Sequence, residues 1–134
     1  MDRHYNIYQI NCFLHDAKVF YISVGSMIEP LRIHMYYDHK LMFGISDQSP
    51  LYPYLCHNPV VSLLAYREDH HYFSYHGTLV FDEEEYSILA KKRSPRLCRY
   101  FNETTHFQLK MFHLEKAEAY IYDAFHNSIK AEID

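Results

Sequence analysis

The chain has 134 residues, a formal net charge of −4 and a hydrophobic content of 49%. This length and apolar content suit one globular domain, placed at residues 1–134, with a substantial core. The 17 acidic against 13 basic residues disfavour a nucleic-acid partner, because a polyphosphate backbone is bound through an excess of Lys and Arg. No apolar run reaches the roughly 18 residues that a membrane span needs, so we expect a cytoplasmic protein without a membrane partner.

The three cysteines, Cys12, Cys56 and Cys98, are far apart and odd in number. This pattern fits reduced thiols better than a disulfide framework, and we expect ordinary packing residues. The chain also contains 14 tyrosines and 9 phenylalanines. Aromatic residues favour strands and half-buried surfaces such as a subunit interface, so the composition indicates an obligate oligomer.

The N-terminal third contains one helix and two strands. Residues 2–17 place apolar side chains at spacings of three and four, which predicts an amphipathic helix that covers one end of a barrel or sheet. A short strand is expected at 19–24. Residues 31–37 alternate, so Arg32 and His34 are expected to point to the same side of one strand.

A polar turn at 46–50 separates the apolar strand 41–45 from a short helix that begins at Pro50. Asn58 and Pro59 end this helix. A short turn joins 41–45 to the preceding strand, so the two strands should be antiparallel neighbours. The hydroxyls and amides of the turn predict a site for a ligand with a phosphate or another oxygen-rich group.

The remaining pattern is again rich in strands. Residues 60–66 are apolar enough to be buried on both faces, and Gly77 within the strand 72–81 marks a bulge or a close backbone approach. Residues 82–85 have the spacing of a capping box for a helix that ends at 91–93. Further elements are expected as a short helix after Pro95 and as strands at 106–114, 117–123 and, with fraying, 128–133.

These elements amount to six or seven strands in runs joined by short turns, with three or four helices. That arrangement indicates an antiparallel barrel or strongly curled sheet of the α+β class, and not alternating βαβ units. No Gly-rich phosphate loop or nucleophile elbow is present, so the pattern does not indicate a kinase or a hydrolase.

The order and spacing of several strings resemble the pyridoxamine 5'-phosphate oxidase-like FMN-binding split β-barrel family of small bacterial flavoproteins. The strings are VFYISV, EPLRIH, KLMFGISDQSPLYPYL, NPVVSLLAY, HGTLVFDEE and HFQLKMFHLEKAEAYIYD. The resemblance covers nearly the whole chain. It implies an antiparallel split β-barrel of six to seven strands with three to four short flanking helices.

The resemblance also implies a cofactor site. In such relatives the flavin lies in a groove between two subunits, and basic and hydroxyl side chains hold its phosphate. The residues at the matching positions, predicted to bind the cofactor, are Arg32, His34, Ser46, Gln48, Ser49 and Tyr52. Many relatives carry lysine in the turn and helix start, where this chain has Ser49 and prolines, so Arg32, with His34 as a second source, is expected to supply the positive charge.

Two functions follow as expectations. The first is a homodimeric FMN-dependent oxidoreductase with an unknown substrate and no nameable catalytic acid or base. The second is a non-catalytic split-barrel protein that has lost FMN or binds another ligand such as haem, for which His34, His76 or His113 could be an axial ligand. The eleven histidines contain no chelating pair at suitable spacing, so no metal site is predicted.

Overall fold

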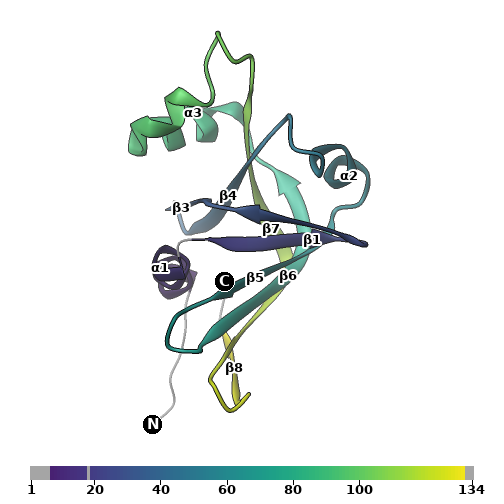
Figure 1. Cartoon of the computed structure of the whole chain (residues 1–134), viewed down its shortest axis with the longest axis vertical. Coiled ribbons are helices and arrows are strands. Elements are labelled where there is room, and N and C mark those ends of the chain that lie inside the picture. Colours follow the sequence, from purple (N-terminus) through teal and green to yellow (C-terminus); the bar gives the residue numbers. More distant parts are fainter. Residues whose placement is uncertain (1–6, 18, 132–134) are drawn as a thin grey trace.

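The computed structural model describes residues 7–17 and 19–131 (Figure 1). Its helices are α1 (Ile7–Ala17), α2 (Tyr52–His57), α3 (Glu84–Arg93) and the 3₁₀-helix η1 (Pro95–Arg99). Its strands are β1 (Phe20–Val24), β2 (Met27–Leu31), β3 (Ile33–Tyr37), β4 (Lys40–Ser46), β5 (Val60–Tyr66), β6 (Tyr72–Phe81), β7 (Leu109–Tyr122) and β8 (Ser128–Ala131). The part of the expected first helix at residues 2–6 lies outside the described residues.

The strands form one antiparallel sheet in the order β2-β1-β5-β6-β7-β4-β3, with β8 paired to β7. The sheet curls into a half-barrel, with α1 beside it and α3 at the opposite end of the long axis from β8 (Figure 1). The predicted α+β class and antiparallel split-barrel architecture are confirmed. None of the described helices is long and apolar enough to cross a membrane.

The main hydrophobic core fills the inside of the curled sheet. Ile10, Phe13 and Leu14 of α1 are buried there at the predicted helical spacing. Phe43 of β4 lies at the centre of an aromatic group, with its ring centroid 5.4 Å from that of Phe20 and 5.7 Å from that of Phe112. Aromatic pairs at such separations add to the stabilisation from buried area, so this group strengthens the packing between β1, β4 and β7.

A second core lies on the outer side of the sheet, under α3 and η1. Ala90 of α3 and Leu97 of η1 pack there against Met35, Met42 and Met111. As a result β4 is buried on both of its faces. The prediction that residues 60–66 form the doubly buried strand is wrong, because β5 alternates between buried and exposed side chains. Within the part of the chain that the structure describes, no helix buries its outer face.

Strand β7 corrects another prediction. The residues expected to form two strands around a turn at 115–116 form a single strand of 14 residues. The ladder with β6 shifts by one residue between His76 and Thr78, and Lys116 opposite this shift has a positive φ of 50°. The residues at this bulge therefore have the sequence pattern of a turn. The bulge or close approach predicted at Gly77 is confirmed, since a Cβ there would lie 2.7 Å from the Cβ of Ala117.

Three smaller predictions are also corrected. The strand expected at 31–37 divides at Arg32, because the chain leaves the ladder with β1 and enters the ladder with β4. As a result Leu31 packs in the main core whereas Met35 packs in the second core. Helix α2 begins at Tyr52, two residues after Pro50. The cysteines are free and exposed, so they are not packing residues.

Candidate functional site

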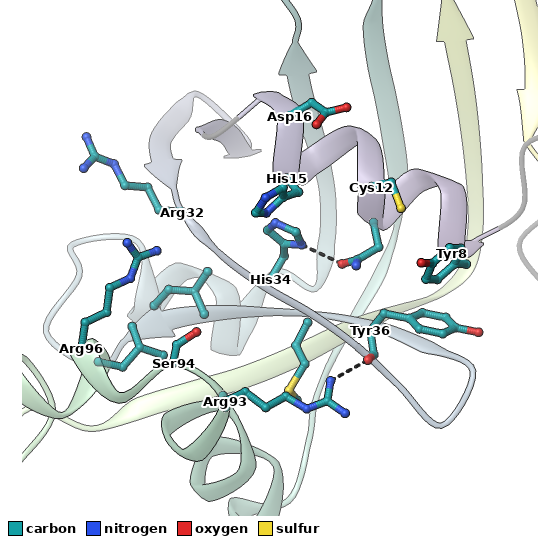
Figure 2. Close-up of a pocket in the computed structure, with 15 residues that line it drawn as sticks. Tyr8, Cys12, His15, Asp16, Arg32, His34, Tyr36, Arg93, Ser94 and Arg96 are labelled. Carbon is teal, nitrogen blue, oxygen red and sulfur yellow. Dashed lines mark hydrogen bonds between the residues drawn. The ribbon is translucent and has the colours of Figure 1, made fainter.

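A cavity of about 540 Å³ lies between α1, β3 and the α3–η1 segment. This volume is within the usual range for small-molecule sites. Its charged lining is mainly basic, with the arginines Arg32, Arg93 and Arg96 and one carboxylate, Asp16. Figure 2 shows Arg32 and Arg96 at one end of the cavity, with the Asp16 carboxylate turned away from them. The cavity therefore favours an anionic ligand.

Arg32 and His34 both line this cavity, as the alternation in the sequence predicted. Arg32 stands at the step from β2 to β3, and its side chain is exposed. Within residues 7–17 and 19–131, no group forms a hydrogen bond or ion pair with its guanidinium. An unpaired arginine at a cavity can offer two parallel N–H donors to a phosphate or a carboxylate.

His34 is held in a defined state. Its Nδ1 lies 2.7 Å from Oδ1 of Asn11 on α1, so Nδ1–H donates and Nε2 keeps its lone pair. The His34 and Phe20 rings are T-shaped to each other, with their centroids 5.9 Å apart. Burial, assisted by the nearby His15, lowers the pKa of His34 from 6.5 to about 4. His34 is thus a neutral imidazole at physiological pH.

The polar turn after β4 is built as a self-contained unit. The Ser46 hydroxyl accepts from the backbone N–H of Gln48 at 3.0 Å, and the Ser49 hydroxyl accepts from that of Leu51 at 3.2 Å. Asp47 fixes the turn to the chain before β7, where its Oδ1 accepts from the Gln108 N–H at 2.9 Å. Both serines therefore serve the turn, while their own O–H groups can still donate to a ligand.

The structure does not bring the six predicted cofactor residues together at one cavity. Arg32 and His34 line the cavity beside α1, whereas Ser46, Gln48, Ser49 and Tyr52 do not. Tyr52 packs its ring against Phe81 at 5.5 Å, and burial is the first cause that raises the pKa of its phenol. The role of these residues in cofactor binding stays a prediction.

Sequence reasoning missed Arg93 and Arg96 at this cavity, because the basic run around them reads as the end of a helix. Arg93 already has partners within the protein: its Nη1 donates to the Tyr36 carbonyl at 2.8 Å (Figure 2). Its guanidinium also lies over the Tyr37 ring, 5.1 Å from the ring centroid. Arg96 forms no hydrogen bond or ion pair within the described part of the chain. The only sequence signal is the Ser94–Pro95 step, which ends α3 and redirects the chain.

Asp82 also differs from its prediction as a helix cap. Helix α3 begins two residues later, and the Asp82 side chain is only 4% exposed. Its Oδ1 accepts from Nδ1–H of His113 at 2.8 Å, which is the main reason that the pKa of His113 is raised. The other nitrogen of His113 lies 3.2 Å from Oε1 of Glu115. These contacts tie the end of β6 to β7.

The three histidines considered as haem ligands can now be separated. Both ring nitrogens of His113 have carboxylate partners, and Nε2 of the exposed His76 lies 3.5 Å from Glu118. His34 alone of the three combines a cavity, a bonded Nδ1 and an unbonded Nε2. Among the described residues, no group of three or more His, Cys, Asp or Glu side chains is arranged to hold a metal ion.

No protein-family model matches the sequence, and no curated protein matches it significantly. The fold, in contrast, matches solved structures. A NimC/NimA family protein from Clostridium acetobutylicum superposes with a TM-score of 0.80 at 18% identity, over 92% of this chain and 90% of that one. A protein from the same organism related to general stress protein 26, of the pyridoxinephosphate oxidase family, gives 0.66 at 12% identity, over 95% and 94%.

A haem-binding protein from Mycobacterium smegmatis has a TM-score of 0.67 at 10% identity, over 91% of this chain and 59% of that one. The present chain thus spans less than two thirds of that protein. Proteins of several kinds therefore share this curled antiparallel sheet. The chain has the split β-barrel fold of the pyridoxamine 5'-phosphate oxidase-like proteins.

Proposed function

We propose that the chain is an FMN-binding flavoprotein of the oxidoreductase type, in which Arg32 holds the flavin phosphate. The observation that carries the proposal is the unpaired Arg32 at the end of a basic cavity of about 540 Å³. When bound, FMN supplies the redox chemistry. The chain's own contribution is to anchor the phosphate and to limit solvent access to the ring.

The proposal includes a homodimer with the flavin at the subunit interface. The dimer is supported by a set of exposed apolar side chains on the solvent-facing side of β1, β2 and β5. We call this side the outer face. These are Tyr21, Ile28, Val60, Leu64 and Tyr66, between 43% and 72% exposed. Tyr21 and Leu64 are direct partners in the ladder. Exposed apolar side chains on one side of a sheet favour association with a second copy. The free, exposed cysteines support a reducing location such as the cytoplasm.

The test is a spectrum of the purified protein before and after incubation with FMN and removal of free flavin. We expect an absorbance band at about 450 nm that bleaches when a nicotinamide donor is added without oxygen. Arg32→Ala should weaken FMN binding about tenfold or more, because a charge-assisted hydrogen bond is lost. A wild-type protein that stays colourless and does not quench FMN fluorescence contradicts the proposal.

Haem is the second candidate, and His34 is the observation that favours it. A neutral imidazole whose Nδ1–H is bonded to a neighbour presents Nε2 as a metal ligand, and the Nδ1 of His34 has this bond to Asn11. Haem bound in this way would give a strong band near about 400 nm that His34→Ala removes. A band that survives this substitution excludes His34 as the ligand.

A further inference from the structure

Two cavity arginines on different elements are available to the same ligand. Arg32 comes from the step between β2 and β3, and Arg96 comes from η1, which lies more than 60 residues later in the chain. Both guanidinium groups are exposed and lack a hydrogen-bond or ion-pair partner within residues 7–17 and 19–131. Figure 2 shows them at the same end of the cavity. Two like charges left unpaired in this way repel each other, and an anion between them removes the repulsion.

The position of Arg96 is fixed by its neighbours. Ser94 and Pro95 end α3 and start η1, and Leu97 is buried in the second core beside Ala90. The backbone around Arg96 is therefore anchored on both sides, although its guanidinium is free to turn. An anchored backbone lowers the entropy that the side chain loses when it binds a ligand.

We infer that Arg32 and Arg96 together form a phosphate-monoester site at the open end of this cavity. The inference deepens the proposed function and rests on it for the identity of FMN as the ligand. A phosphate monoester carries close to two negative charges at pH 7, which matches two arginines. Each planar guanidinium can form parallel hydrogen bonds with two phosphate oxygens. Arg93 is not part of this site, because its guanidinium already contacts the Tyr36 carbonyl and the Tyr37 ring.

The chain offers a close control for Arg96. Arg99 lies on the same 3₁₀-helix, is equally classed as exposed and does not line the cavity. In a 3₁₀-helix, residues three apart lie on the same side. Arg96→Ala and Arg99→Ala therefore remove the same side chain from one side of one helix, and only the first removes it from the cavity.

The experiment measures the dissociation constants of FMN and riboflavin by fluorescence quenching for the wild type and both variants. Arg96→Ala should weaken FMN about tenfold or more and leave riboflavin unchanged, whereas Arg99→Ala should change neither. Arg32→Ala combined with Arg96→Ala should bind FMN no more tightly than riboflavin. Equal FMN affinity in the Arg96→Ala and Arg99→Ala variants overturns the inference, and so does an equal loss of FMN and riboflavin.

Inorganic phosphate separates this inference from the choice of flavin. Its binding is followed by ³¹P line broadening with the same variants. If the wild type binds no flavin but binds phosphate in an Arg96-dependent way, the proposed FMN function fails and the phosphate site stands. If Arg96→Ala binds phosphate as the Arg99→Ala control does, the site fails. A wild-type protein that binds neither FMN nor phosphate overturns both.

Discussion

The burial of His34 predicts a pH-dependent stability that can be worked out from the structure. The pKa of His34 is about 4 in the folded chain, against 6.5 when it is exposed. Below pH 6.5 the unfolded chain therefore binds a proton that the folded chain does not. Because the unfolded state binds more protons, the free energy of unfolding falls as the pH falls. The contribution is fully present above pH 6.5 and is lost as the pH falls toward 4.

The magnitude follows from these two pKa values. Between pH 7.5 and pH 5, the protonation of His34 in the unfolded chain lowers the free energy of unfolding by about 2 kcal/mol. His113 acts in the opposite direction: its raised pKa stabilises the fold at low pH, and this contribution is lost as the pH rises through the folded value. The net pH profile of the wild type therefore mixes both histidines.

Comparison with His34→Gln isolates the contribution of His34. Glutamine retains an N–H that can donate to Asn11 but does not titrate. Urea unfolding at pH 7.5 and at pH 5 should show a difference between wild type and variant that changes by about 2 kcal/mol, with the variant gaining relative stability in acid. A difference that is the same at both pH values refutes the account of His34 as a buried, neutral imidazole.

The remaining predictions concern the bulge and the outer face. Gly77→Ala places a Cβ within 2.7 Å of the Ala117 Cβ and 3.0 Å of the Glu115 carbonyl oxygen. It should lower the free energy of unfolding by about 1 to 3 kcal/mol, and adding Ala117→Gly should restore part of the loss; an unchanged urea midpoint contradicts the close approach. Leu64→Glu should weaken self-association at least about tenfold in light scattering. Ile88→Glu on α3 is a matched control, since both residues are 46% exposed; equal effects of the two substitutions refute the role of the outer face.

The sequence predicted those features that depend on local pattern. The helical spacing of Ile10, Phe13 and Leu14 identified the buried side of α1. The strong alternation around His34 identified a strand paired antiparallel with β4. Gly77 marked the site where the backbones approach closely. In each case neighbouring residues impose the structure, so a short stretch is sufficient to predict it.

The features that were missed depend on contacts between distant segments. Whether β4 or β5 is buried on both faces is decided by the position of α3 and η1, which the strand sequences do not encode. The sequence around Lys116 fits a bulge and a turn equally well, so it does not distinguish between them. The pair of Asp82 and His113 spans 31 positions, so the capping spacing of its acidic neighbours was the stronger local signal.

The candidate site shows the same division. Arg32 and His34 were predicted to point to the same side because they alternate on one segment, and they line one cavity. Arg96 reaches the same cavity only through the break after α3 and the burial of Leu97. The polar turn at 46–50 was predicted as a turn and as a cofactor site. Its internal hydrogen bonds account for the turn.

The measurement that tests the central claim most directly is the ratio of the dissociation constants of riboflavin and FMN for the wild-type protein. The two ligands share the ring and the ribityl chain and differ only in the phosphate. The account predicts that FMN binds at least about tenfold more tightly, through charge-assisted hydrogen bonds to the phosphate. Equal dissociation constants, or no binding of either flavin, would contradict it.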